Sequence, residues 1–235
     1  MPTFRVGSVR LWDSETRWSQ VQPRRDVFDR TVLDRHVAAA SAAGLPVVYT
    51  FGATPDWAAT PGTRTPYEDG SRTSAPRDLA DWGAFVEAVA TRYRGRIGAY
   101  ELWVSAPSAT FWSGSAEELV AMTRRATGIV RRVDPKATVV CPSMGDLWQE
   151  SSRRFLERFS LLGGYDDCDV AGVKPAPQDF SDPPESLLEL TDLIRTSFHR
   201  GGRHLWTWST GRRTRSRRPP ASASATPATT QSGST

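Results

Sequence analysis

Short apolar segments rich in β-branched residues alternate with helical segments five times along this chain, and this alternation limits its fold more than any other feature. The candidate strands are Val9–Asp13, Pro46–Phe51, Ala99–Ser105, Ala137–Pro142, Cys168–Lys174 and Arg203–Ser209. When each strand is followed by a helix, successive strands lie parallel and are joined by right-handed crossovers. The sequence therefore predicts the α/β class.

The segments between these strands repeat apolar residues every three to four positions, which is typical of one buried helix face. The expected helices cover residues 27–37, 79–93, 115–134, 153–162 and 184–200. Gly44 is expected to end the first of them. The third opens with Ser115-Ala116-Glu117-Glu118, the pattern of a capping box that satisfies exposed helix N–H groups.

Two architectures fit this order of elements, a doubly wound open sheet and a (β/α) barrel. A doubly wound nucleotide binder carries a glycine-rich turn after its first strand, but here Asp13-Ser14-Glu15-Thr16 follows, and no GxGxxG or P-loop occurs. The strands end in Trp, Asp, Ser and Pro, which suits an open pocket at the carboxyl face of a barrel. We predict an incomplete (β/α)8 TIM-barrel-like domain with about six recognisable strand–helix units.

The positive charge of the chain is concentrated at its C-terminal end. Residues 212–235 contain five arginines and no acidic residue, so the formal net charge of +4 becomes −1 for residues 1–211. The rest of that segment is Ser, Ala, Thr, Pro, Gln and Gly, which bury little apolar surface. We predict a barrel domain over 1–211 and a disordered tail over 212–235, and we disfavour the alternative of a nucleic-acid-binding arm.

Several other classes of protein are disfavoured. No apolar run is long enough to span a membrane, and residues 1–7 show no secretory signal, so the chain is cytoplasmic as written. HExxH, GxSxG and CxxC motifs are absent, and we expect no metal and no cofactor. Cys141 ends one predicted strand and Cys168 begins the next, which predicts a separation of about 15 Å and no disulfide.

The segment Tyr100-Glu101-Leu102-Trp103-Val104-Ser105-Ala106-Pro107-Ser108 resembles the fourth strand of retaining glycoside hydrolases of clan A, nearest to family 39, the β-xylosidase family. That family shows Tyr-Glu-x-Trp-Asn-Glu-Pro-Asn there. Residues 9–18, 47–58 and 205–211 resemble its second, third and seventh strands. The resemblance implies that the first and eighth strands are missing, through truncation or a shifted reading frame, or that the open sheet edges pair with another chain.

The resemblance also implies that both catalytic carboxylates are lost. Ser105 stands at the position of the acid/base, and Ser209 at that of the nucleophile. Retaining hydrolysis needs two carboxyl groups about 5–5.5 Å apart, and a serine hydroxyl supplies neither role. We therefore expect a catalytically impaired barrel that binds carbohydrate. The alternative is a weak O-glycosyl hydrolase that uses a displaced carboxylate such as Asp13 or Glu101.

Aromatic and acidic residues at the ends of the strands are the candidates for sugar binding. The predicted substrate-binding set is Trp12, Asp13, Trp57, Trp103, Trp112, Trp148 and Trp206, with core packing as the alternative for about half of the tryptophans. For Asp56 and Asp146, contact with a sugar and capping of a loop are equally open alternatives. Strand alternation points Glu101 inward, where a structural ion pair with Arg10 is expected. Lys174 stands where the family usually shows a His.

Overall fold

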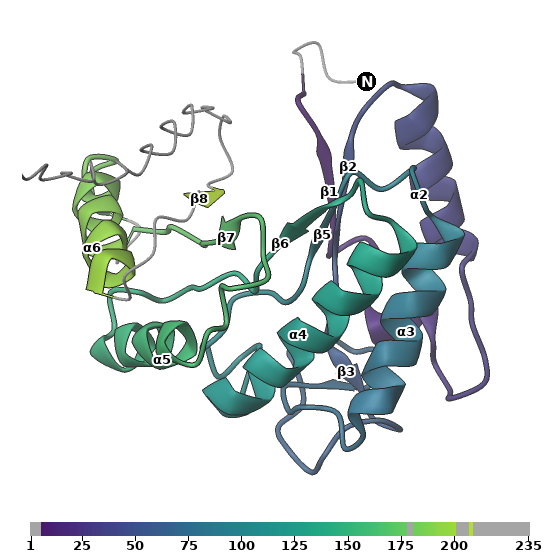
Figure 1. The fold of residues 1–235 in the computed structure, drawn as a ribbon, viewed down its shortest axis with the longest axis horizontal. Helices are drawn as coiled ribbons and strands as arrows, with labels where there is room; N and C mark the ends of the chain where they lie inside the picture. The colour runs from purple at the N-terminus through teal and green to yellow at the C-terminus, as the bar shows by residue number, and fades with distance from the viewer. Residues whose placement is uncertain (1–5, 178–180, 201–206, 209–235) are drawn as a thin grey trace, which may run out of the picture.

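The computed structural model describes residues 6–177, 181–200 and 207–208 of the chain (Figure 1). Its main helices are α2 (Thr31–Ala42), α3 (Leu79–Arg92), α4 (Ala116–Val133), α5 (Glu150–Leu161) and α6 (Ser186–Arg200), and a short helix α1 covers Trp18–Val21. Its parallel strands are β1 (Val9–Leu11), β2 (Val47–Thr50), β5 (Ala99–Glu101), β6 (Thr138–Val140), β7 (Ala171–Gly172) and β8 (Thr207–Trp208).

The parallel strands follow one another across the sheet in chain order. Pairing runs β1-β2-β5-β6, and β7 pairs with β8. A parallel bridge between Val140 and Val170 carries the sheet from β6 towards β7, and the Cys141 amide donates to the Val170 carbonyl at 2.8 Å. The α/β class and the barrel-like order of strands are confirmed.

The strands are shorter than the sequence predicts. Each predicted strand keeps two to four paired residues, and Glu101 is the last paired residue of β5. The chain then leaves the sheet, so the alternation that places Glu101 inward does not extend to Trp103 or Ser105. The part of the chain beyond residue 208, including Ser209 and the tail 212–235, lies outside the described residues, as does Trp206.

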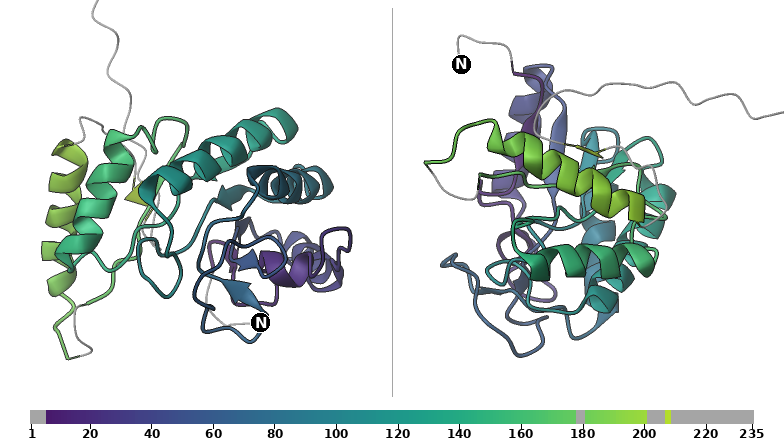
Figure 2. Two further views of the ribbon diagram at one scale, coloured as in Figure 1. Left: turned by 90° about the horizontal axis from the view of Figure 1, so that it is seen from below. Right: turned by 90° about the vertical axis from the view of Figure 1, so that its left-hand side faces the viewer.

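The helices lie on the outer side of the sheet and form an arc around it (Figures 1 and 2). Capping sets where two of them begin. The Asp78 carboxylate accepts from the Ala80 amide at 2.7 Å at the start of α3, and the predicted capping box of Ser115 and Glu118 opens α4. Helix α2, the first of the predicted helices, begins at Thr31. This is later than predicted, because Val27 belongs to a turn bridged to Arg24.

Aromatic rings fill the space between the sheet and helix α3. Phe51 stacks on Tyr100 with centroids 5.6 Å apart, and Phe85 of α3 stacks on Trp18 at 5.0 Å. Trp82 of α3 lies 5.6 Å from Phe51, and its indole N–H donates to the Met122 carbonyl of α4. All five rings are fully buried. Large apolar area removed from water makes this layer the main source of stability.

The inner face of the same sheet is lined by much smaller apolar side chains. Val48, Ala99 and Val140 form a separate cluster there, with Val170 packed against it. Arg10, Thr50 and Glu101 project on the same side, because they alternate with the outward-facing Leu11, Tyr49 and Tyr100. The inner face is therefore small and polar where the outer face is large and aromatic.

An antiparallel hairpin between β2 and α3 has no counterpart in the prediction. It consists of β3 (Thr54–Pro55) and β4 (Ser71–Arg72). Asp69 joins it to the segment after β1 by accepting from Arg17 Nε at 2.7 Å and from Ser19 Oγ at 2.9 Å. Burial raises the pKa of Asp69, but hydrogen bonds from Ser71, Arg17 and Ser19 outweigh it, so the pKa lies below its ordinary value.

Cys141 and Cys168 form a disulfide, so the prediction of two distant thiols is wrong. Their Cα atoms lie 5.5 Å apart. Cys168 does not begin a strand. It follows a turn over residues 163–167, and the pairing of Val140 with Val170 keeps it beside the end of β6. The error came from treating residues 168–174 as one straight strand.

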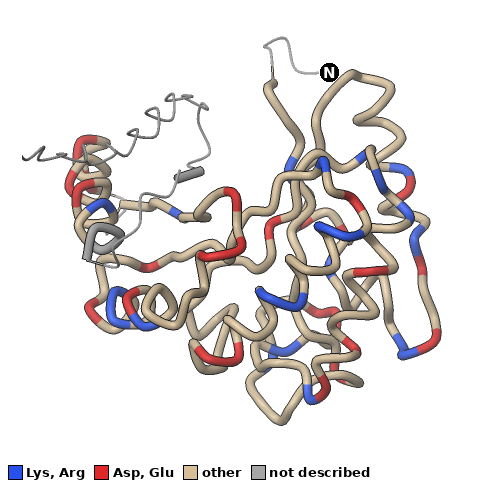
Figure 3. Tube along the Cα trace, viewed as in Figure 1, with Lys and Arg blue, Asp and Glu red and all other residues tan. Residues whose placement is uncertain are grey.

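The outer surface carries charges of both signs, and several ion pairs join neighbouring helices (Figure 3). Asp34 of α2 pairs with Arg92 of α3, and Arg132 of α4 pairs with Glu87 of α3 at 3.2 Å. Arg158 of α5 pairs with Glu117 of α4 at 2.6 Å. These pairs are largely exposed, and each contributes little to stability.

Candidate functional site

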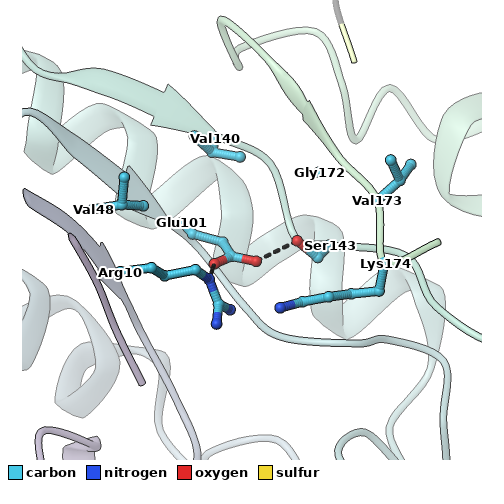
Figure 4. A pocket seen from close by; sticks show the side chains of 8 residues that line it. All are labelled: Arg10, Val48, Glu101, Val140, Ser143, Gly172, Val173 and Lys174. Atoms are coloured by element: carbon cyan, nitrogen blue, oxygen red, sulfur yellow. Dashed lines mark hydrogen bonds and ion pairs between the residues drawn. The ribbon is translucent and has the colours of Figure 1, made fainter. Parts of the chain in front are cut away.

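A pocket opens on the inner face of the sheet, towards the carboxyl ends of the strands (Figure 4). Its lining comes from β1, β2, β5, β6 and the segment around β7, and consists of Arg10, Val48, Glu101, Val140, Ser143, Gly172, Val173 and Lys174. Ligand sites of parallel barrels lie at this end of the strands. The pocket is therefore the candidate functional site.

Glu101 is held by three donors at the floor of the pocket. Its side chain is 4% exposed, and Arg10 Nε and Thr50 Oγ1 both donate to its Oε2 at 2.6 Å. Ser143 Oγ donates to the other oxygen, Oε1. With both oxygens engaged by donors, this carboxylate is held in one orientation.

Arg10 uses only part of its guanidinium on Glu101. Its Nη2 atom is buried and has no hydrogen-bond partner among the described residues. The side chain as a whole is 28% exposed. A buried guanidinium N–H without an acceptor is costly, so this atom is available for a ligand.

Lys174 enters the pocket from the segment that follows β7 (Figure 4). Its backbone amide donates to the Met144 carbonyl at 2.7 Å, which fixes the start of the side chain. Burial lowers the pKa of the Lys174 amine from its ordinary value. The Glu101 carboxylate opposes that shift, and the Arg10 charge adds to it. The pocket thus contains two cations and one carboxylate.

Gly172 allows the segment around β7 to approach β6 closely. A Cβ atom at this position would lie 2.6 Å from Ser143 Oγ and 2.7 Å from the Cys141 carbonyl oxygen. No side chain fits between these atoms. A glycine here therefore brings Lys174 and Ser143 to the same pocket.

Ser105 lies in the loop after β5, in a backbone conformation unusual for its residue type. Its φ is +47°, in the left-handed region, and its side chain is half-buried. A Cβ atom on Gly145 would lie 2.5 Å from Ser105 Oγ, so the hydroxyl occupies the space that a side chain at 145 needs. Ser105 supplies a neutral hydroxyl where the resemblance expects an acid.

Three of the tryptophans predicted to bind sugar are core residues. Trp103 is 0% exposed, Trp112 is 2% exposed and Trp12 is 3% exposed. Trp103 packs edge-on against Trp112, with centroids 5.2 Å apart, and also against Trp82 at 6.0 Å. Rings covered by protein offer no face to a sugar, which favours the core-packing alternative for these three.

Trp57 and Trp148 are half-buried, and each indole N–H is engaged by the backbone. Trp57 donates to the Gln22 carbonyl at 3.0 Å, and Trp148 donates to the Ala176 carbonyl at 2.8 Å. Neither lines the pocket. Their role in sugar binding stays a prediction, as does that of Trp206, which is not among the described residues.

The three aspartates beyond the strand ends are in different surroundings. Asp56 pairs with Arg64 at 3.0 Å and with Arg72 within the hairpin region. Asp146 is exposed in a turn before α5, with a φ of +57°. The Asp13 side chain is 70% exposed and accepts from Tyr67 Oη at 2.8 Å.

Of these, only Asp13 acts on the pocket electrostatically, because its charge raises the pKa of Lys174. Arg17 Nη1 lies 3.7 Å from its carboxylate and partly neutralises it. The structure does not bring Asp56 or Asp146 to the pocket. Asp13 is thus the one predicted aspartate near the site.

Sequence reasoning missed Thr50, Ser143 and Tyr67. Thr50 and Ser143 both donate to Glu101. The strand alternation that places Glu101 inward could also have indicated Thr50. Ser143 follows β6 in a loop, and Tyr67 comes from the unpredicted hairpin region. No sequence pattern places either of them.

No group of His, Cys, Asp and Glu residues within 6–177, 181–200 and 207–208 has the arrangement of a metal site. In the same part of the chain, no helix is long and apolar enough to cross a membrane.

Comparison with known proteins finds similarity at the level of structure. No protein-family model and no curated protein matches the sequence. A xylanase XynB from Paenibacillus barcinonensis matches 83% of this chain and 58% of its own, with 18% identity and a TM-score of 0.57. A glucosidase from Croceicoccus marinus matches 84% of this chain and 43% of its own, with 18% identity and a TM-score of 0.63.

A GH10 xylanase from Thermobacillus composti matches 92% of this chain and 66% of its own, with 17% identity and a TM-score of 0.57. The chain therefore spans between 43% and 66% of these three structures. At such identities the matches establish the fold and do not single out family 39. The chain has the α/β parallel-sheet fold of TIM-barrel glycoside hydrolases over part of their length.

Proposed function

We propose that this chain is a glycoside-hydrolase-like barrel of the family 39 type that binds carbohydrate in the pocket of Arg10, Glu101 and Lys174, with hydrolysis lost or strongly reduced. The observation that carries the proposal is the hydrogen bonding of the carboxylate in the pocket. Among the described residues, Glu101 is the one acidic residue lining the pocket, and it accepts from three donors. Retaining hydrolysis requires two carboxyl groups, one of them free to attack the anomeric carbon.

Two further observations support the loss of catalysis. Ser105 carries a hydroxyl at the position of the acid/base, and this group is a poor proton donor at neutral pH. Thr50, Ser143 and Arg10 all donate to Glu101, so both of its oxygens are already engaged within the protein. The likeness to glycoside hydrolases supports a sugar-binding pocket. Ser105 and the hydrogen-bonded Glu101 support the loss of hydrolysis.

Binding and turnover are measured separately to test this proposal. Xylose- and glucose-based oligosaccharides are titrated into the full chain, because xylanases and a glucosidase share the fold. Hydrolysis of aryl β-xylosides and aryl β-glucosides is followed in parallel, because an aryl leaving group needs little acid assistance. We expect binding without turnover. Absence of binding to every oligosaccharide would overturn the carbohydrate role.

A second candidate is a weak glycosidase that uses Asp13. This carboxylate is exposed, is oriented by Tyr67 and lies close enough to affect Lys174. Aryl glycoside turnover that disappears in Asp13→Asn and persists in Asp192→Asn would favour it. Asp192 is a matched control, because it is 77% exposed on α6 and lies outside the pocket.

A further inference from the structure

We propose that Lys174 is a reactive amine, and that the pocket takes a small aldehyde which this amine binds covalently as an imine. The inference goes beyond the carbohydrate-binding function proposed above and does not depend on it. It concerns a reaction of the lysine itself, so neither a free carboxylate nor hydrolysis is needed.

Lys174 lacks the partner that a buried lysine ordinarily has. The residue is half-buried, and its amine reaches into the pocket towards Glu101 (Figure 4). The donors to that carboxylate are Arg10, Thr50 and Ser143. Within the described part of the chain, the Lys174 amine makes no hydrogen bond and no ion pair of its own. A lysine withdrawn from water is usually paired, so this amine is unusual and is open to a reactant.

The surroundings of Lys174 favour the neutral form of the amine. Three apolar side chains line the pocket with it, those of Val48, Val140 and Val173. Burial lowers the pKa of Lys174, and the Arg10 guanidinium on β1 adds to this shift. The carboxylates of Glu101 on β5 and of Asp13 after β1 oppose it without reversing it. Only the neutral amine has a free lone pair, so burial beside a second cation makes a lysine more nucleophilic at neutral pH.

The backbone presents the amine from a fixed position. The Lys174 amide donates to the Met144 carbonyl at 2.7 Å, and Met144 also forms a parallel bridge with Val173. The Cys141–Cys168 disulfide ties the same two segments together a few residues earlier. A nucleophile that is already positioned loses little freedom when it reacts, which lowers the barrier to attack.

The reaction is a condensation that needs only the amine and the aldehyde. The nitrogen lone pair of Lys174 attacks the carbonyl carbon, the C=O π electrons move to oxygen, and a proton passes from nitrogen to that oxygen. The resulting carbinolamine loses its hydroxyl and its remaining N–H proton as one water, which leaves the C=N bond of the imine. An aldehyde carbon carries one substituent chain, so it approaches an amine in a lined pocket with less crowding than a ketone.

The sequence supplies an internal control, because it contains two lysines, Lys174 in the pocket and the exposed Lys136 outside it. The full chain is incubated with glyceraldehyde or propanal and sodium cyanoborohydride, which reduces an imine to a stable secondary amine. Peptide mass spectrometry then measures the rate of labelling at each lysine. At pH 7 we expect Lys174 to be labelled about tenfold or more faster than Lys136, in proportion to its larger neutral fraction.

Three further measurements separate a reactive lysine from one that only packs in the pocket. As the pH is raised, the labelling rate of Lys174 should level off at a lower pH than that of Lys136. In chain unfolded by urea the two rates should become equal, because the difference depends on the fold. Lys174→Met should abolish the fast labelling and leave the rate at Lys136 unchanged, and Lys136→Met should keep the fast labelling.

Labelling of Lys174 no faster than that of Lys136 in the folded chain would overturn the proposal. A fast rate that persists in urea would also overturn it, because the pocket would then not be its cause. The two aldehydes distinguish the source of the carbonyl: faster labelling by glyceraldehyde supports an open-chain sugar, and faster labelling by propanal supports a simple aldehyde. Oligosaccharide binding is measured without any labelling, so failure here is distinguishable from failure of the carbohydrate role.

Discussion

The two faces of the parallel sheet differ sharply, although the same short strands build both. On the outer face, Tyr49 and Tyr100 are fully buried against helices and other rings. On the inner face, one residue further along the same strands, Thr50 and Glu101 form a polar network beside small valines. Strand alternation thus separates a large aromatic surface from the polar surface that forms the candidate site within a few ångströms.

This division has a consequence for mutation. Outer-face residues contribute through buried area, so their loss should lower the free energy of unfolding and leave ligand recognition intact. Inner-face residues contribute through hydrogen bonds and charge, so their effects should be coupled to one another. The following predictions measure how complete that separation is.

The largest effect is expected from Phe85→Ala in the outer layer. The ring is fully buried and stacks on Trp18, so its removal should lower the free energy of unfolding by about 3–5 kcal/mol. Leu161→Ala is the control, because Leu161 is 74% exposed and should change stability by less than about 0.5 kcal/mol. Urea unfolding measures both, and similar midpoints would contradict the role assigned to the outer layer.

Removal of the Cys141–Cys168 disulfide should have the next largest effect. The two cysteines are separated by 27 positions, and closing a loop of that length is expected to stabilise the folded state by about 3–4 kcal/mol. The double variant Cys141→Ser/Cys168→Ser should therefore unfold at lower urea concentration than the wild type under oxidising conditions. Under reducing conditions the difference should largely disappear, and a difference of the same size in both conditions would show that it does not come from the bond.

On the inner face, Arg10 and Glu101 should behave as a coupled pair. Replacing one partner leaves the other charge without its buried counterion, so Arg10→Met and Glu101→Gln should each destabilise the fold. The double variant should be more stable than the sum of the two single effects predicts, with a coupling energy of about 0.5–3 kcal/mol. A double-mutant cycle by urea unfolding measures this energy, and strict additivity would argue against the network.

The smallest effect is expected at the outer surface, from the half-exposed Asp34. The Arg92 guanidinium holds the pKa of Asp34 below its ordinary value, and Tyr93 adds a hydrogen bond. The pair should stabilise the fold above about pH 4, and this contribution should disappear as the pH falls through the lowered pKa of the folded state.

Asp34→Asn should therefore cost about 0–1 kcal/mol at pH 7 and less at pH 3. Thermal unfolding at several pH values checks this dependence. A cost for Asp34→Asn that is independent of pH would exclude the ion pair as its source.

The outer layer was the easier part to predict from sequence. Trp82, Phe85, Val86 and Val89 recur at helical spacing, and that spacing depends only on local geometry. Glu101 and Arg10 could also be placed, because strand alternation is equally local. The rest of the site depends on loops. Ser143 and Tyr67 reach their partners through segments whose course follows from tertiary packing.

Two errors have the same physical source. Trp103 was placed within a predicted strand over Ala99–Ser105, and Cys168 at the start of one over Cys168–Lys174. In both cases the chain leaves the sheet sooner than the apolar pattern indicates. An apolar run records burial, and both residues are buried, but burial does not distinguish a strand from a packed loop.

The conformation of Ser105 bears on any attempt to engineer hydrolytic activity into this barrel. A left-handed backbone costs about 1–3 kcal/mol for a residue other than glycine, for glutamate as for serine. Its hydroxyl also occupies the space against Gly145, where a longer side chain has to find another path. A single Ser105→Glu exchange would therefore set a longer side chain on a strained backbone and against Gly145. The loop over residues 102–108 would have to be redesigned together with the strand end that presents it.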